Sequence, residues 1–202
     1  MVKTTLKRIF AIVGSALAPI AAILYFILGI QAILGINGDV TVNVFLFIKF
    51  LLCFTLAVFL TLFGGKVLFS FLNNEDKDEP FVKLALSFVI YEFAYNLFFI
   101  CFWGGTAANW LMLIFSFAGT LTLLVRVTGI KTAWYTDVVG VGIAMLTAMT
   151  TACASSGVML AASVIVAVVC FLVMAIFALF LIKDEPQNTK ETKNSNDDEI
   201  KF

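Results

Sequence analysis

The chain alternates between long apolar segments and short polar ones, and the length of the apolar segments indicates the fold class. A bilayer core of about 30 Å needs about 20 residues of helix, and every peptide group inside it must be hydrogen-bonded within that helix. The pattern predicts six spans, at residues 9–34, 44–63 (with a continuation to 72 as the alternative), 81–103, 110–127, 137–154 and 158–182. We therefore expect an all-α integral membrane protein, a bundle of six transmembrane helices.

Polar segments at both ends complete this plan. Residues 1–8 are predicted to form a cytoplasmic amino-terminal segment, and residues 183–202, rich in Lys, Asn, Asp and Glu, a disordered polar cytoplasmic tail. The start of the chain also resembles a signal peptide, with Ala16 and Ala18 as a small-residue cleavage site. We expect no cleavage, because the apolar run continues to Leu34 and Pro19 would directly follow the cut.

The distribution of cations predicts the orientation in the membrane. With a cytoplasmic amino terminus, 12 of the 13 Lys and Arg residues fall on the inner side, and Lys49 alone lies toward the outside. The inner set comprises Lys3, Lys7, Arg8, Lys66, Lys77, Lys83, Arg126, Lys131, Lys183, Lys190, Lys193 and Lys201. By the positive-inside rule both termini are then cytoplasmic, and we expect a multi-pass protein of the plasma (cell) membrane.

Composition narrows the function classes. The chain is 62% hydrophobic and contains 13 basic and 13 acidic residues, so nothing in its charge favours a nucleic-acid partner. Histidine is absent, which removes the commonest general base and zinc ligand. Recognisable catalytic motifs are also missing. We expect no enzymatic activity, no cofactor and no metal site, with a membrane enzyme as the least favoured class.

The four cysteines lack the short spacing of metal or redox motifs. Cys53 and Cys170 are predicted at mid-depth as small hydrophobic residues. Cys101 and Cys153 both fall near the outer ends of their spans, so a disulfide between them is an open alternative.

One ionisable residue lies in the middle of an otherwise apolar span. Inserting a carboxylate near mid-bilayer costs on the order of 3 kcal/mol, so such residues are rare and usually face the protein interior. Glu92 is followed by Tyr95 and Asn96 at i+3 and i+4, which places the three side chains on one helical face. Glu92 is therefore the principal candidate for a functional residue.

Three roles for Glu92 are open. Its carboxyl group can be neutral and hydrogen-bonded to Asn96, a tyrosine or a threonine of the fifth span; it can pair with a lysine of the second span; or it can bind a proton or a cationic ligand. The candidate ligand or proton site comprises Glu92, Asn96, Tyr95, Lys49, Thr147 and Thr151.

Small residues recur every four positions in two spans, a spacing that lets helices approach closely. In the fifth span they are Gly140, Ala144, Ala148 and Ala152, and in the first they are Gly14, Ala18 and Ala22. We expect both faces to pack against other helices. The alternatives are a polar path along the threonines of the fifth span and partner docking by the first.

Taken together, these features favour a small membrane subunit or substrate-binding component of a transport system. The alternative is a non-catalytic accessory or assembly protein. In size, span number and its small-residue first helix the chain is similar to the substrate-binding subunits of energy-coupling-factor transporters. In that family a first-helix A-x-x-x-A pattern, matched here by Ala18 and Ala22, docks a shared transmembrane subunit. The resemblance implies membrane and ATPase subunits as partners.

Overall fold

The computed structural model describes residues 2–72, 79–130 and 134–181, and these ranges form six α-helices. They are α1 (Val2–Leu34), α2 (Val40–Leu72), α3 (Glu79–Trp103), α4 (Ala107–Val127), α5 (Trp134–Ala154) and α6 (Gly157–Leu181). Each is long and apolar enough to cross a membrane, so the predicted all-α fold with six potential spans is confirmed. The predicted tail at residues 183–202 lies outside the described residues.

The helix ends differ from the predicted spans in a consistent direction. Helix α1 begins at Val2, so the described part of the predicted amino-terminal segment is helical. Helix α2 runs through Gly64 and Gly65 to Leu72, the end of the longer predicted segment. The predicted spans cover only the hydrophobic part of each helix. A helix itself continues into the polar interface until a capping or helix-breaking residue ends it.

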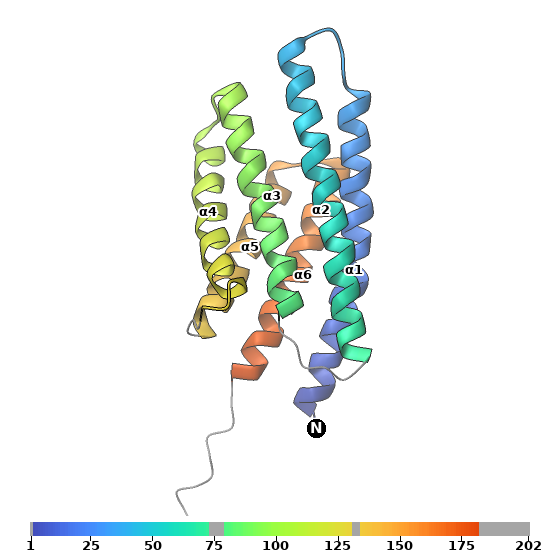
Figure 1. Ribbon diagram of the computed structural model, residues 1–202, viewed down its shortest axis with the longest axis vertical. Helices are drawn as coiled ribbons and strands as arrows, with labels where there is room; N and C mark the ends of the chain where they lie inside the picture. The colour runs from blue at the N-terminus through green and yellow to red at the C-terminus, as the bar shows by residue number, and fades with distance from the viewer. Residues whose placement is uncertain (1, 73–78, 131–133, 182–202) are drawn as a thin grey trace, which may run out of the picture.

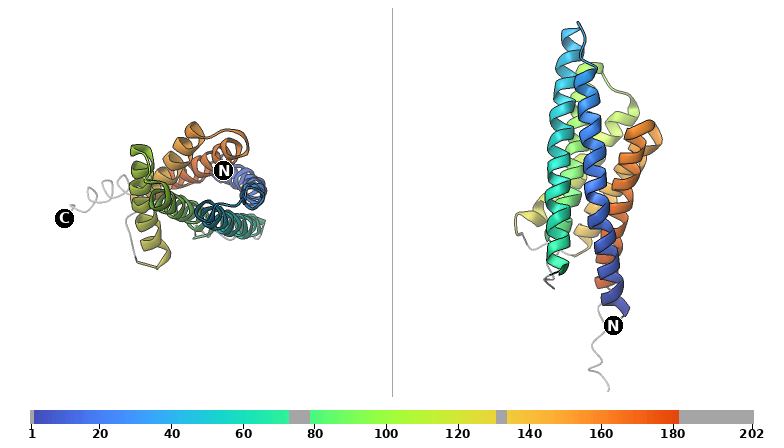
Figure 2. Two further views of the ribbon diagram at one scale, coloured as in Figure 1. Left: turned by 90° about the horizontal axis from the view of Figure 1, so that it is seen from above. Right: turned by 90° about the vertical axis from the view of Figure 1, so that its right-hand side faces the viewer.

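Consecutive helices are antiparallel neighbours, and the arrangement closes because α6 packs against α1. Helix α3 contacts α2, α4, α5 and α6, whereas α4 contacts only α3 and α5 among the described helices. Seen from above, α3 therefore lies toward the middle of the bundle (Figure 2). Any polar residue on its inner face is enclosed by several helices.

The helices are of unequal length, and the bundle is therefore uneven at one end. Helices α1 and α2 have 33 residues each, or about 50 Å at 1.5 Å per residue, and α5 has 21 residues, or about 32 Å. The turn between α1 and α2 consequently extends beyond the turn between α5 and α6 (Figure 1).

Two glycines allow the closest helix contacts. A Cβ atom on Gly140 of α5 would lie 2.5 Å from Leu123 Cδ2 of α4, and one on Gly64 of α2 would lie 2.9 Å from the Cβ of Ala18 in α1. Both distances are too short for a methyl group. Glycine is therefore required where α4 meets α5 and where α1 meets α2.

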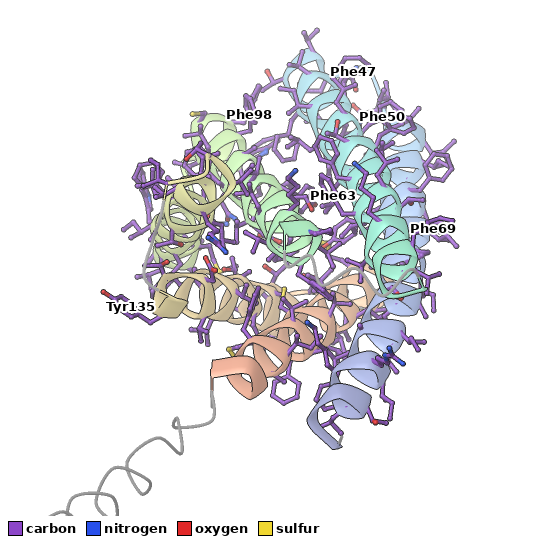
Figure 3. The ribbon with its side chains drawn as sticks, turned by 60° about the horizontal axis from the view of Figure 1, so that its bottom comes forward. Phe47, Phe50, Phe63, Phe69, Phe98 and Tyr135 are labelled. Carbon is purple, nitrogen blue, oxygen red and sulfur yellow. The ribbon has the colours of Figure 1, made fainter. Side chains whose placement is uncertain are left out.

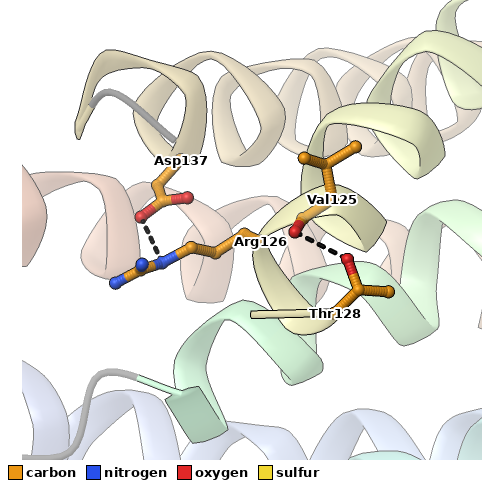
Figure 4. Close-up of polar contacts among 4 residues, drawn as sticks. All are labelled: Val125, Arg126, Thr128 and Asp137. Carbon is orange, nitrogen blue, oxygen red and sulfur yellow. Dashed lines mark hydrogen bonds and ion pairs between the residues drawn. The ribbon is translucent and has the colours of Figure 1, made fainter. Parts of the chain in front are cut away.

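An ion pair joins α4 and α5 at their connection. Arg126 Nε lies 3.2 Å from Asp137 Oδ2, and the two side chains are 42% and 9% exposed. Arg126 is in the last turn of α4 and Asp137 in the first turn of α5 (Figure 4). Each charge also complements the dipole of its own helix end.

Aromatic side chains of α2 divide between the exterior and the interior. Phe47 and Phe69 lie on the outside of the bundle, as does Tyr135 of α5 (Figure 3). Phe45, in contrast, is buried, and its ring packs against those of Tyr95, Phe99, Phe102 and Trp103 of α3 at centroid distances of 5.8 to 6.1 Å. This aromatic cluster joins the start of α2 to the end of α3.

Candidate functional site

Glu92 lies in the middle of α3 and is 1% exposed. The side-chain amide nitrogen of Asn96 donates to Glu92 Oε2 at 3.3 Å and to the Glu92 backbone carbonyl at 2.8 Å. The i, i+4 spacing on a helix produces this contact. One oxygen of the buried carboxyl group is therefore held by its own helix, and Asn96 is nearly fully buried as well.

The second carboxyl oxygen is in a different situation. Within the part of the chain that the structure describes, Glu92 Oε1 has no hydrogen-bond partner, and neither has the hydroxyl of Thr151 on α5. The Thr151 hydroxyl lies near the carboxyl group but makes no hydrogen bond with it. Buried polar atoms are rarely unsatisfied in native proteins, so these two oxygens are the unusual feature of the site.

Two other predicted site residues, Thr147 and Lys49, make contacts with groups other than the Glu92 carboxyl group. Thr147 is buried one turn before Thr151, but its hydroxyl donates to the Ile143 carbonyl of its own helix. Lys49 makes no ion pair with Glu92 among the described residues, and its ammonium group lies 5.9 Å from the centroid of the Tyr95 ring instead. The lysine is held there as a cation over an aromatic face.

Tyrosines line the same level of the bundle. The Tyr25 ring of α1 packs edge-on against Tyr91 at a centroid distance of 5.2 Å, and Tyr91 stacks on Tyr95 at 6.0 Å. The Tyr91 hydroxyl lies 3.7 Å from the sulfur of Cys53 on α2. Tyr95, predicted as a site residue, thus connects the lysine to this aromatic row.

Sequence reasoning missed Tyr25 and Ser163. The Ser163 hydroxyl of α6 lies beside that of Tyr25, and each oxygen is buried without a geometric hydrogen-bond partner in the described ranges. Ser163 is the single hydroxyl-bearing side chain in the α6 sequence, and Tyr25 is the single tyrosine in α1. A single polar side chain of its kind in an otherwise apolar helix was the signal available in the sequence.

A small cavity serves as a reference point for the depth of Tyr25, Glu92 and Ser163 in the bundle. Its volume is about 10 Å³, and apolar side chains of α1, α2, α3 and α6, among them Ala21, Phe88 and Val166, line it. Tyr25 and Glu92 each lie four residues, about one turn, beyond a lining residue of their helix. Ser163 lies three residues before Val166 on the antiparallel α6. The unpartnered oxygens on α1, α3 and α6 therefore share one level.

A third residue missed from the sequence is Asn109, near the start of α4. Its side-chain amide nitrogen donates to Asn96 Oδ1 at 3.4 Å, and its own Oδ1 accepts from the backbone N–H of Thr106 at 3.0 Å. Thr106 caps α4 in a reciprocal capping box with Asn109. The T-x-x-N spacing was visible in the sequence, but the contact with α3 was not.

The predicted packing residues lie inside the protein. Ala144, Ala148 and Ala152 are buried along α5, and Gly14, Ala18 and Ala22 are buried along α1. Ala18 is 0% and Ala22 is 4% exposed. The face that would dock a partner in the resemblance described above is therefore covered by this chain's own helices.

Of the four cysteines, Cys53 and Cys170 are buried and Cys101 and Cys153 are exposed, and all four are free thiols in the described part of the chain. The disulfide that the sequence left open is not formed in the structure.

Six apolar helices around a buried carboxyl group identify the chain as a polytopic membrane protein and no more. Comparison with protein-family models, with curated proteins and with solved structures found no match for this chain.

Proposed function

We propose that this protein is a small membrane subunit or substrate-binding component of a transport system, in which Glu92 takes up a proton or a small cation. One observation carries the proposal. A carboxyl group enclosed at mid-helix keeps one oxygen without a hydrogen-bond partner in the described residues. Placing it there is unfavourable for folding, so a functional use of that oxygen explains its presence.

The surroundings of Glu92 support a ligand of very small size. Glu92 is 1% exposed, and the cavity of about 10 Å³ one turn away is lined by apolar side chains that do not include it, so a larger ligand has no room beside the carboxyl group. The oxygens near this level come from a carboxyl group and the hydroxyls of Tyr25, Thr151 and Ser163. Oxygen donors suit protons and hard cations.

We also propose the orientation expected from the sequence. Lys7, Lys66, Lys83 and Arg126 lie near the helix ends at the end of the bundle where α1 begins. By the positive-inside rule this end is cytoplasmic. The turn between α3 and α4, which carries Thr106, then faces outward, and the plasma membrane remains the proposed location.

Recovery of partners tests whether the protein is part of a larger transporter. The full chain, tagged at its carboxyl terminus, would be extracted in a mild detergent and its companions quantified by mass spectrometry. Stoichiometric recovery of an ATPase or a second membrane subunit supports the proposal. Recovery as a single monodisperse species contradicts the subunit assignment and favours a self-contained carrier or an accessory protein.

Transport by a Glu92 variant tests the role of the buried carboxyl group. Glu92→Gln is expected to leave expression and partner recovery unchanged while removing transport. Ser87→Ala is the matched control, because Ser87 is a buried polar residue of the same helix whose hydroxyl donates only to its own turn, to Leu84 O at 2.8 Å. Unchanged transport by Glu92→Gln would assign Glu92 a purely structural role and reject its part in transport.

A further inference from the structure

Three side chains connect Glu92 to the turn between α3 and α4. The Thr106 hydroxyl lies 2.8 Å from Asn109 Oδ1, the Asn109 amide nitrogen donates to Asn96 Oδ1 at 3.4 Å, and Asn96 donates to Glu92 Oε2 at 3.3 Å. Thr106 is exposed, Asn109 half-buried and Asn96 buried. The chain thus leads from the surface of the bundle to its enclosed carboxyl group.

Backbone groups at the two ends fix the direction of this chain. The Thr106 backbone N–H can only donate, and it donates to Asn109 Oδ1 at 3.0 Å. The Glu92 backbone carbonyl can only accept, and it accepts from Asn96 Nδ2 at 2.8 Å. Each side-chain amide has one accepting and one donating end. Asn109 must therefore present its nitrogen to Asn96, and Asn96 must present its nitrogen to Glu92.

A donor directed at a carboxyl oxygen favours the charged form of that group, and successive hydrogen bonds polarise one another. We propose that Asn109 is a positioning residue: it holds the Asn96 amide as a donor to Glu92 and so favours the negatively charged carboxylate that binds a proton or small cation. This inference rests on the proposed role of Glu92 in binding and extends it to a residue of the next helix.

The capping function of Asn109 does not require this contact. The capping box uses Asn109 Oδ1 and the Asn109 backbone N–H, and its side-chain nitrogen is left to point toward α3. The variant Asn109→Asp keeps both capping contacts and removes only the donor. With a carboxylate at position 109, Asn96 Oδ1 faces an acceptor in place of a donor. The orientation that gives the Asn96 nitrogen to Glu92 then loses one of its two supporting contacts, the other being the Glu92 backbone carbonyl, and the weaker donor favours the protonated acid.

The charge state of Glu92 can be read by chemical labelling. Dicyclohexylcarbodiimide is a lipid-soluble reagent that reacts with protonated carboxylic acids; the acid adds across a carbon–nitrogen double bond, and the adduct retains every atom of both. The full-length protein in mild detergent would be labelled at one fixed pH, chosen on the alkaline side of the wild-type pH profile, where most of the carboxyl group is ionised and the labelling rate follows its protonated fraction. Peptide mass spectrometry would follow the adduct at Glu92. Glu92→Gln identifies the labelled position.

Asn109→Asp is expected to raise the labelling rate of Glu92 about tenfold, which corresponds to a carboxylate that binds its proton about ten times more tightly. Its melting temperature should stay within about 2 °C of wild type, because the cap is preserved. Ala108→Asp is the matched control, since it adds the same charge at the exposed neighbouring position. It should change the rate less than about twofold, because an exposed charge is screened by solvent.

Equal rates for wild type and Asn109→Asp, whether both label or neither does, would overturn the inference. An equal increase in Ala108→Asp would also overturn it, because charge alone would then explain the effect. The transport measurement on Glu92→Gln is independent of this labelling. Normal transport by Glu92→Gln together with faster labelling of Asn109→Asp would reject the proposed function and retain the hydrogen-bond chain.

Discussion

The contact between α4 and α5 gives a quantitative prediction for Gly140→Ala. The new Cβ would lie 2.5 Å from Leu123 Cδ2, 2.7 Å from Leu123 Cγ and 2.8 Å from Thr122 Oγ1. Carbon atoms in favourable contact are about 3.5 to 4.0 Å apart, so the leucine must retreat by about 1 Å. Leu123 is fully buried, and the contact involves Cγ as well as a terminal methyl group. A simple rotation of the side chain therefore cannot relieve it.

The expected magnitude follows from two opposing effects. Overpacking typically destabilises a protein by about 1 to 3 kcal/mol, and the upper part of that range applies because the leucine is enclosed. Alanine is favoured over glycine inside a helix by about 1 kcal/mol. Gly140→Ala should therefore lower the free energy of unfolding by about 2 kcal/mol.

Gly142→Ala is the matched control on the same helix. Its Cβ would meet only Met174 Sδ, at an ordinary 3.6 Å, and methionine adapts readily. This variant should be neutral or more stable by up to about 1 kcal/mol. Reversible unfolding by titration with a denaturing detergent, followed by circular dichroism, measures both. If Gly140→Ala is as stable as Gly142→Ala, the close contact does not exist as described.

A double variant tests the identity of the clashing group. Leu123→Ala alone should destabilise by about 2 to 5 kcal/mol through the cavity it leaves. In that background Gly140→Ala should lose most of its penalty, because both Leu123 contacts are gone and only the Thr122 Oγ1 contact at 2.8 Å remains. Persistence of the full penalty would point to a different contact.

Two further predictions concern other regions of the bundle. Gly64→Ala should destabilise the protein by about 1 to 2 kcal/mol, because its Cβ would lie 2.9 Å from the Cβ of Ala18 in α1. Gly65→Ala should not destabilise it, since nothing lies within 4 Å of that Cβ. The same detergent titration compares the two variants. Cys101 and Cys153 are exposed near the carboxyl-terminal ends of α3 and α5. If the proposed orientation holds, a membrane-impermeant maleimide added outside cells should label both. Labelling only after the membrane is opened would contradict the proposed orientation.

The six-helix plan was predictable because bilayer thickness sets a minimum length for each apolar segment. The helix ends were less predictable, since hydrophobicity marks the lipid core and not the cap. Helix α4 begins at Ala107 because Thr106 and Asn109 form a capping box there, three residues before the apolar span begins.

The site was predictable only where its contacts lie within one helix. Glu92 and Asn96 meet because they are four residues apart. Thr147 and Thr151 belong to one stripe, yet the Thr147 hydroxyl donates within its own helix and the Thr151 hydroxyl lies near Glu92. The contacts of Asn109 and Ser163 likewise depend on how separate helices pack, which sequence spacing does not encode.

Ion movement through the reconstituted protein tests the role of Glu92 most directly. The purified protein, with any companion subunits, would be placed in lipid vesicles, and dissipation of an imposed proton or sodium gradient followed with a trapped pH-sensitive dye or radioactive sodium. Wild type and Ser87→Ala should behave alike. Glu92→Gln should be slower by at least about tenfold, corresponding to about 1.4 kcal/mol in the barrier to ion movement. Equal rates for all three proteins would contradict the account.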